Sequence, residues 1–583
     1  MREHALKYFC LVFLAVVAVL SFRTSLEDYD IWFHLKYGEH YVRNLTWHID
    51  HSVYSWTPTV PDWKYVTWLG SSVLYLAYLA GAFPGLAALQ WSIFIALFAL
   101  YCSYIKSSGD ALDVTHITAL LLAAIAFSVI LPYIKPEMFT ALFFAITVFV
   151  YFRAKSSGKN LFYAYPVLLL LWVNTHGGFL FGLFFISAVL ILELANTLFI
   201  RKSSLSGKLV RSLALSVFLS YIAVLVNPYG IHYHLKLLQD LFFSSYMEHS
   251  SKILAYQGIW QFFFPKAFNY VFMYGALSLF VMAVSLAALA LHAYARYRFF
   301  DPVVLLLNLL FFLLIIKYPR SIFFFPIVWL FSVAFYLSKT DSGRIRKKLL
   351  PVALAVFLIF GGGFLYDTYS FMAYKSFFGS GIDDWVPEKE VAFIKEKKLP
   401  GPIFNDYLVG GYMIWALYPE YKVFIDPRYG PYVHQVLGDW FGLHNNLTPE
   451  HLAKFTGKYR FNTVLMHLRE PNIIRWLLGS GQWKLIYFDK SAAVLVRLSV
   501  FETLDNETRS TDLGPARFRD VSSPTILTRV FDTYAGMGRL DDMQEIYETY
   551  VRNVSDANHT KEWSVEMMKL NLEFARKRAP QAR

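Results

Sequence analysis

Long apolar stretches recur along this chain from its first residues to about residue 366, and they limit the folds that it can adopt. A helix needs about 20 mostly apolar residues to cross a bilayer. Only 16% of the residues are charged and the mean hydropathy is +0.41, whereas about a quarter of the residues in a typical soluble domain are charged. The sequence therefore predicts a polytopic α-helical membrane protein. The expected spans lie approximately at 6–22, 86–105, 113–131, 137–152, 160–173, 178–200, 209–226, 268–292, 302–316, 321–338 and 348–366.

The residues between these stretches predict the topology. The opening segment "MREHALKYFCLVFLAVVAVLSF" lacks a small-residue cleavage site, so we expect an uncleaved first helix. The stretch 65–83 is also apolar; the chain has about twelve spans if it crosses the bilayer and about eleven if it lies at the surface. With a cytoplasmic N-terminus, the positive-inside rule is obeyed only if 65–83 does not cross. We therefore predict about eleven spans in the inner membrane, with everything after residue 366 extracytoplasmic.

This arrangement also explains the net charge of +12 without a nucleic-acid partner, because basic loops set the orientation of membrane proteins. Cys10 and Cys102 lie in apolar stretches, so we expect neither a disulfide framework nor a Cys/His metal site. The predicted cytoplasmic loops contain Lys106, Arg153, Lys155, Lys159, Arg201, Lys202, Lys208, Arg296, Arg298, Lys339, Arg344, Arg346, Lys347 and Lys348.

An acidic stretch, "LEDYDIWFHLKYGEHY" at 26–41, follows the first span on the predicted outer side. On a helix, Asp30 and His34 would share a face. Asp28 and Asp30 could take a proton from an attacking hydroxyl or hold a divalent metal ion. The alternative is a set of solvated charges at a helix exit, and these residues alone slightly favour that alternative.

Other predicted outer loops carry groups suited to an anionic or sugar substrate. A cation just outside the bilayer suits a phosphate, although a single lysine there more often extends its amine toward lipid headgroups. Asn174 and His176 in "WVNTHGG" could bind a sugar or simply end helices. The candidates for substrate binding are His34, Lys135, Glu137, Asn174, His176, Lys317 and Arg320.

The region after the last span reads as a folded outer domain. "GPIFNDY", "YKVFIDP", "FNTVLMH", "WKLIYFD" and "AAVLVRL" have the pattern of short strands, and helical stretches intervene. We predict a small α/β domain over 367–500, a linker over 501–524 and a helical segment over 525–583. Asp426 and Arg428 at a strand end could bind substrate or cap turns. "YAGMGRLDDMQEIYETY" resembles half of a tetratricopeptide-type hairpin, which suggests a helical cap or a contact with a protein partner.

The stretches "DYDIWFHLKYGEHYV", "HIDHSVYSWT" and "DWKYVTWLGSSVLYLAYLAGAFPGL" resemble the first outer loop, here 23–85, of GT-C-fold membrane glycosyltransferases. "WVNTHGGFLFGL", "LVNPYG" and "NDYLVGGYMIW" resemble an uncharacterised bacterial branch of that superfamily. The resemblance covers roughly residues 1–366. It implies a GT-C-like fold, juxtamembrane helices in the first outer loop, and Asp30 or Asp28 as the catalytic carboxylate.

The resemblance further implies inverting transfer of a sugar from a polyprenyl-phosphate donor to an extracytoplasmic acceptor. The chain lacks the "HPPLGK"-like stretch of the mannosyltransferases and has "WKYVTWLG" instead, so the donor sugar is not identified. The alternative is a non-catalytic GT-C-like scaffold or lipid-carrier binder of cell-envelope glycan assembly. A transporter is disfavoured because few ionisable residues fall at mid-bilayer depth; Glu193, near a helix end, is an exception.

Overall fold

The computed structural model describes residues 2–21, 26, 28–61, 63–129, 133–202, 205–242, 270–318, 321–340, 342–372, 381–433, 435–554 and 560–578. The chain divides into two compact units. The helical unit comprises Met1–Thr24, Tyr37–His48 and Lys64–Thr368. The second, which we call the α/β unit, comprises Ser25–Lys36, Ile49–Trp63 and Tyr369–Arg583. Two pieces of the predicted first outer loop therefore belong to the α/β unit.

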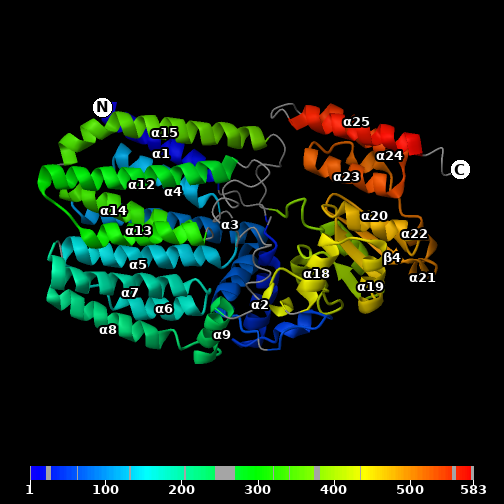
Figure 1. Cartoon of the computed structure of the whole chain (residues 1–583), viewed down its shortest axis with the longest axis horizontal. Helices are drawn as coiled ribbons and strands as arrows, with labels where there is room; N and C mark the ends of the chain where they lie inside the picture. Colours follow the sequence, from blue (N-terminus) through cyan, green and yellow to red (C-terminus); the bar gives the residue numbers. More distant parts are fainter. Residues whose placement is uncertain are drawn as a thin grey trace. The chain divides into compact units, whose positions relative to one another are not determined.

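A helix coincides with each of the eleven predicted spans, and most of these helices run roughly parallel in Figure 1. Asp113, Ser206 and Asp301 begin three of them by accepting a backbone N–H of the first turn. The helices are α1 (Arg2–Ser21), α3 (Trp68–Ser107), α4 (Val114–Phe127), α5 (Glu137–Ser157), α6 (Ala164–Val173), α7 (Phe179–Ala195), α8 (Gly207–Ala223), α12 (Tyr270–Tyr297), α13 (Pro302–Lys317), α14 (Phe324–Lys339) and α15 (Ser342–Met372). The shorter η2 (Asn196–Ile200) and α9 (Ile231–Phe242) complete this set.

Five helical stretches within the described ranges are long and apolar enough to cross a membrane. Further apolar helices have 10–17 residues, which is shorter than a typical span. The chain is thus mostly helical with several candidate spans, while the expected total of eleven stays a prediction. The five stretches are Trp68–Ser107, Glu137–Ser157, Phe179–Ile200, Val271–Tyr297 and Lys347–Thr368.

Helix α3 is broken near residue 82, where the sequence analysis separates the stretch 65–83 from the following span. Gly81 and Ala82 have non-helical backbone angles, with φ −165° and ψ 25° at Gly81 and φ 49° and ψ −133° at Ala82. Pro84 follows and cannot donate a backbone hydrogen bond. The two parts of α3 are therefore separate helical segments, as a surface segment followed by a span would require.

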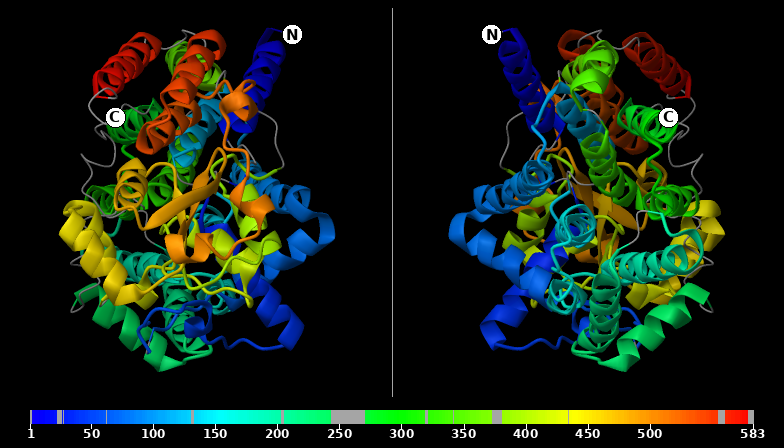
Figure 2. Two further views of the ribbon diagram at one scale, coloured as in Figure 1. Left: turned by 90° about the vertical axis from the view of Figure 1, so that its right-hand side faces the viewer. Right: turned by 90° about the vertical axis from the view of Figure 1, so that its left-hand side faces the viewer.

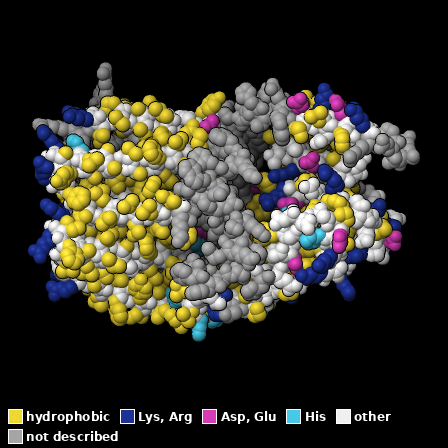
Figure 3. All heavy atoms as spheres, in the orientation of Figure 1, with side chains coloured by type: hydrophobic (Ala, Val, Ile, Leu, Met, Phe, Trp, Pro, Cys, Tyr) yellow, Lys and Arg dark blue, Asp and Glu magenta, His cyan; other side chains and the backbone are white. Residues whose placement is uncertain are grey.

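Exposed basic residues gather at one end of the helical unit. Figure 3 shows a surface of almost continuous hydrophobic side chains over these helices, with Lys and Arg at the end away from the α5 N-terminus. The exposed residues include Lys106, Lys159, Arg201, Lys202, Lys208, Arg211, Arg296, Arg298, Lys339, Lys347 and Lys348. Most of the loops predicted to be cytoplasmic therefore share one end of the bundle.

Lys155 departs from this pattern. Its amine lies 2.5 Å from Glu193 Oε1 and 3.1 Å from Asp301 Oδ2, and all three side chains are at most 1% exposed. Tyr151 also donates its hydroxyl to Glu193 at 2.8 Å. The prediction that Lys155 lies in a cytoplasmic loop is wrong, because Lys155 is part of α5 and its buried amine is paired with two carboxylates. The cluster joins α5, α7 and the N-terminus of α13.

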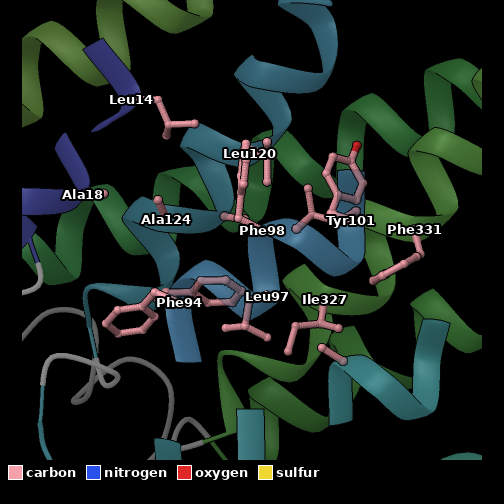
Figure 4. Close-up of a pocket in the computed structure, with 14 residues that line it drawn as sticks. Leu14, Ala18, Phe94, Leu97, Phe98, Tyr101, Leu120, Ala124, Ile327 and Phe331 are labelled. Carbon is pink, nitrogen blue, oxygen red and sulfur yellow. The ribbon is translucent and has the colours of Figure 1, made fainter. Parts of the chain in front are cut away.

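An apolar cavity of about 130 Å³ lies inside the helical unit. Figure 4 shows residues of α1, α3, α4 and α14 around it, among them Leu14, Phe94, Leu120 and Phe331. Apart from Tyr101, the residues that line it are all apolar. The cavity therefore offers space to an apolar chain and little acid–base chemistry.

A four-stranded sheet in the order β1-β2-β4-β3 forms the centre of the α/β unit. β1 pairs with β2 in parallel, with Ile403 opposite Thr463, and the other pairings are antiparallel. The strands are β1 (Ile403–Asn405), β2 (Thr463–His467), β3 (Trp483–Phe488) and β4 (Ala492–Arg497), so four of the five predicted strands are confirmed.

The fifth, "YKVFIDP", is not a strand of this sheet. Val423 forms only an isolated bridge with Ser55. The Asn405 side chain accepts the Phe424 N–H and donates to the Ile425 carbonyl, both at 2.7 Å. A side chain thus takes the place of strand-to-strand hydrogen bonds here, and this was not predictable from the alternating pattern.

Helices pack around the sheet, and further helices follow β4 up to the C-terminus. The segment predicted as a linker is not free: Phe518 is fully buried and its ring lies 5.7 Å from that of Phe488. The last three helices lie side by side in Figures 1 and 2, and Gly538, with φ 69°, ends the first of them. The helices are α2 (Asp30–Asn44, which continues into the helical unit), η1 (His51–Tyr54), α16 (Glu388–Glu396), α17 (Gly410–Leu417), η5 (Gly430–Tyr432), α18 (Val436–Asn445), α19 (Pro449–Tyr459), α20 (Pro471–Gly479), α21 (Leu498–Phe501), α22 (Asn506–Arg509), η6 (Pro515–Phe518), α23 (Pro524–Met537), α24 (Leu540–Asn553) and α25 (Thr560–Arg578).

Candidate functional site

The two aspartates of the acidic stretch lie at the start of α2. The Asp28 carboxylate accepts the backbone N–H of Asp30 at 2.7 Å, and α2 begins at Asp30. Both side chains are half-buried. A helix N-terminus presents unpaired backbone N–H groups, and the Asp28 carboxylate accepts one of them. His34 lies one turn further along α2 but is only 2% exposed, so its imidazole does not share their access to solvent.

The rest of the α/β unit holds this motif in place. Leu26 forms a parallel bridge with Ile382. The Trp32 ring meets the Tyr412 ring edge-on, with centroids 4.8 Å apart. A Cβ added to Gly411 would lie 2.3 Å from the Tyr29 carbonyl oxygen, so only glycine permits this approach of α17 to the motif. The acidic motif is therefore part of the α/β unit.

A second cluster of polar side chains in the same unit lies at the carboxyl ends of the parallel strands β1 and β2. Ligands often bind at such an edge of a sheet. Asp406 follows β1 directly and is 1% exposed. Its Oδ1 accepts the Leu408 N–H at 2.7 Å, while Oδ2 has no hydrogen-bond partner among the described residues. Burial raises the pKa of Asp406 to about 6, against the opposing effect of the Arg469 charge.

Glu470 connects the remaining charged groups at this edge. It lies 3.2 Å from His444 Nε2 and 3.6 Å from Arg469 Nε. Burial opposes ionisation of both His444 and Glu470, but their mutual hydrogen bond prevails, so the pKa of Glu470 is lowered and that of His444 is raised. The sequence analysis did not select His444, Arg469 or Glu470; for Arg469 and Glu470, the position just after "FNTVLMH" was the available signal.

A third group lies in the helical unit, at the end of α5 away from Arg153. Lys135 is 9% exposed, and its amine lies 4.0 Å from Glu137 Oε1. His176 Nε2 lies 3.8 Å from the same oxygen. The structure thus brings together three of the predicted residues: Lys135, Glu137 and His176.

The hydrogen bonds of His176 indicate its tautomer. Nδ1 accepts the Gly178 N–H at 3.1 Å and lies 2.9 Å from the Thr140 hydroxyl. Trp172 donates its indole N–H to the same hydroxyl oxygen at 2.9 Å, which directs the Thr140 proton toward His176. The ring proton is then on Nε2, on the side of Glu137.

Asn174 serves a structural role. Its Oδ1 accepts the Trp68 indole N–H at 2.7 Å, and its Nδ2 donates to the carbonyls of Leu170 and Val226 at 2.9 and 2.8 Å. The Asn227 side chain likewise bonds to its own turn. Of the two interpretations of Asn174, the structure supports the one in which it ends and joins helices, because its polar atoms are already engaged.

Asp426 and Arg428 are also engaged with each other. Arg428 Nη2 lies 2.7 Å from Asp426 Oδ2, and both side chains are 0% exposed. The predicted substrate contact is corrected to a buried ion pair, since neither side chain offers an exposed atom. Lys317 is the last residue of α13, and its side chain is not described. Arg320 lies outside the described residues.

Comparisons with known proteins give similarity only at the level of solved structures. No family model matches the chain, and no curated protein matches it. ArnT from Cupriavidus metallidurans, a GT-C-fold protein, matches in the apo state with a TM-score of 0.40 and 13% identity, over 85% of this chain and 99% of ArnT. The structure of ArnT bound to undecaprenyl phosphate matches with a TM-score of 0.38 and 12% identity, over 85% and 98%. Similarity at this level does not define the activity or substrate of this chain.

Proposed function

We propose that this protein is an integral membrane glycosyltransferase that moves a sugar from a polyprenyl-phosphate carrier to an extracytoplasmic acceptor. The observation that carries the proposal is the fixed pair of carboxylates at the start of α2. Asp28 holds the first turn through the Asp30 N–H, and both carboxylates keep access to solvent. An apolar helical unit supplies the environment that a lipid-borne donor needs.

In the proposed reaction, Asp30 accepts the proton of the acceptor hydroxyl, whose oxygen attacks the anomeric carbon of the sugar. The bond from that carbon to the phosphate oxygen breaks, and the polyprenyl phosphate leaves with its electron pair. Attack opposite the leaving group inverts the anomeric centre. A cationic group beside the phosphate would offset the negative charge that develops on it.

Lys135 is a candidate within the helical unit for binding a phosphate. Glu137 Oε1 lies 4.0 Å from its amine and 3.8 Å from His176 Nε2, so Glu137 helps to hold the amine in place. A nearly buried amine is weakly hydrated and interacts strongly with a phosphate.

A divalent metal ion is the alternative use of Asp28 and Asp30. Within the described ranges, no group of three or more His, Cys, Asp or Glu side chains converges as a metal site. A cation held by these two aspartates would need further oxygen ligands from phosphate or water, as Mg²⁺ commonly has. The bound ion would supply electrostatic stabilisation of the departing phosphate.

The competing function is a non-catalytic scaffold or lipid-carrier binder. We propose to compare Asp30→Asn and Asp28→Asn with Asp50→Asn in a strain that lacks the protein. Asp50 is the matched control, because it is an exposed aspartate of the same unit that also caps a helix, accepting the Ser52 N–H at 2.9 Å. The readouts are the masses of cell-surface glycans and binding of polyprenyl phosphate to the purified protein.

For a transferase, at least one motif variant loses the glycan product while it keeps lipid binding and membrane insertion, and Asp50→Asn behaves as wild type. A double variant, Asp28→Asn with Asp30→Asn, that still restores the glycan would refute catalysis and support the scaffold.

We place the protein in the inner membrane, with a cytoplasmic N-terminus and a periplasmic α/β unit. The exposed basic residues at one end of the helical unit support this orientation. A protein partner at the C-terminal helices stays a prediction; α25 there exposes Met567, Leu570 and Phe574.

A further inference from the structure

Three aromatic and cationic side chains of the α/β unit stack on one another. The guanidinium carbon of Arg529, on α23, lies 3.9 Å from the centre of the Trp385 ring. The Trp385 ring also stacks on the His467 ring, with centroids 5.0 Å apart and an interplanar angle of 28°. His467 ends β2 and is fully buried. The position of the Arg529 guanidinium is therefore set by a rigid support.

Stacking on Trp385 covers one flat face of the Arg529 guanidinium. The N–H groups point outward in the plane of the guanidinium, so they can still donate hydrogen bonds. Among the residues that the structure describes, no carboxylate pairs with Arg529 and none of its side-chain N–H groups has a hydrogen-bond acceptor. Arg428 differs sharply, because it donates to Asp426, the His51 carbonyl and Tyr432. A half-buried guanidinium without a carboxylate is costly, so the arrangement favours a bound anion.

A second arginine lies at the same edge. Arg469 follows β2, and its backbone N–H donates to His467 Nδ1 at 3.1 Å. Burial of Arg529 lowers the pKa of its own guanidinium, and the Arg469 charge lowers it further, to about 10. Glu470 is shared between Arg469 and His444, so one carboxylate serves two cationic partners. Asp406 also lies at this edge, so the cation left without a carboxylate partner among the described residues is Arg529.

We propose that Arg529 and Arg469 form a binding subsite for a phosphate group at the carboxyl end of β1 and β2, with Trp385 as its support. Planar guanidinium groups suit phosphate oxygens because two parallel N–H groups can bind two oxygens. Tyr29 lies close enough to Arg529 for the two groups to interact, so the phosphate would bind beside the acidic motif. The phosphate could belong to a water-soluble ester or to a lipid headgroup.

The subsite can be tested by binding, without any transfer reaction. The full-length protein in nanodiscs of neutral lipid is titrated with inorganic phosphate and with glycerol 3-phosphate, and binding is followed by phosphorus NMR. We expect Arg529→Gln and Arg469→Gln each to weaken binding by about tenfold or more, the loss expected for a charge-assisted hydrogen bond. Arg529→Lys should bind phosphate more tightly than Arg529→Gln but less tightly than the wild type, since lysine keeps the charge but lacks the paired N–H donors of a guanidinium.

Arg519→Gln is the matched control, because this arginine of the same unit already pairs with Glu545 at 2.9 Å and should leave phosphate binding unchanged. Unchanged binding in both Arg529→Gln and Arg469→Gln, or no phosphate binding by the wild type, would overturn the proposal. Arg469 is largely exposed, so its variant keeps the test valid if Arg529→Gln fails to fold. Competition by nanodiscs that contain phosphatidylglycerol would assign the site to a lipid headgroup, and its absence to a soluble ester.

Discussion

Arg428 and Asp426 form a bidentate ion pair inside the α/β unit. Arg428 Nε lies 2.7 Å from Asp426 Oδ1, and Nη2 lies 2.7 Å from Oδ2. Tyr432 donates its hydroxyl to the same carboxylate, and Arg428 Nη1 donates to the His51 carbonyl at 2.7 Å. The pair thus joins residues of the first outer loop to the loop after α17.

We predict that Arg428→Met and Asp426→Asn each destabilise the α/β unit by about 3–5 kcal/mol, because each leaves an unpaired partner buried. Limited proteolysis of the full-length protein in detergent measures the effect. Arg519→Met is the control and should change stability by less than about 1 kcal/mol, since its pair with Glu545 is exposed. An Arg428→Met protein as resistant to proteolysis as wild type would contradict the structural role.

Gly411→Ala should displace the acidic motif, because the added Cβ would lie 2.3 Å from the Tyr29 carbonyl oxygen. We expect faster hydrogen exchange at the first turns of α2 and lower transfer activity, although no charge is removed. Gly457→Ala is the control; a Cβ there meets nothing within 4 Å, and alanine favours the helix. Wild-type exchange in Gly411→Ala would show that the contact does not position the motif.

Glu390 makes the stability of the α/β unit depend on pH. Its carboxylate accepts the backbone N–H groups of Asp489 and Ala492 at 3.2 and 2.9 Å, and burial raises its pKa to about 7. The folded state holds this proton more tightly than the unfolded state. Stability therefore falls by up to about 3 kcal/mol as the pH rises from about 4.5 to about 7, and is constant above.

We expect Glu390→Gln to remove most of this dependence, so that the variant resists proteolysis better than wild type at pH 8 and similarly at pH 5. Glu388→Gln, an exposed change on the same helix, is compared at each pH and should follow the wild type. A wild-type protein more stable at pH 8 than at pH 5 in this unit, with no difference from Glu390→Gln, would contradict the assignment.

The orientation can be checked by thiol labelling. In a background that lacks Cys10 and Cys102, we expect Lys484→Cys to react with an impermeant maleimide when the outer face of the inner membrane is accessible. Lys159→Cys and Lys202→Cys should react only after the membrane is broken. All three positions are exposed, so access is limited by the bilayer alone. Equal labelling of both classes would exclude the proposed topology.

Local features of the chain were predictable because they depend on neighbours in the sequence. The eleven apolar stretches are helices, since a continuous apolar segment satisfies its own backbone and needs no particular partner. Four strands follow from alternating patterns. The acidic stretch also begins a helix at Asp30, where Asp28 supplies the capping oxygen.

Features that depend on distant contacts were missed or misassigned. Lys155 has the sequence context of a loop cation, yet its partners Glu193 and Asp301 come from other helices. Val423 lies in an apparent strand, but the Asn405 side chain takes the neighbouring backbone groups. Neither outcome has a local signal, because burial and pairing are set by which elements pack together.

Short segments of the sequence determine where helices form, where the acidic motif lies and on which side of the membrane the basic loops are expected. Capping and hydrophobic patterning act over only a few residues. The tertiary structure alone decided that Asp426 and Arg428 satisfy each other, that the motif belongs to the α/β unit, and that Arg529, Trp385 and His467 stack. Electrostatic pairing and stacking act through space between residues far apart along the chain, and packing determines which side chains meet.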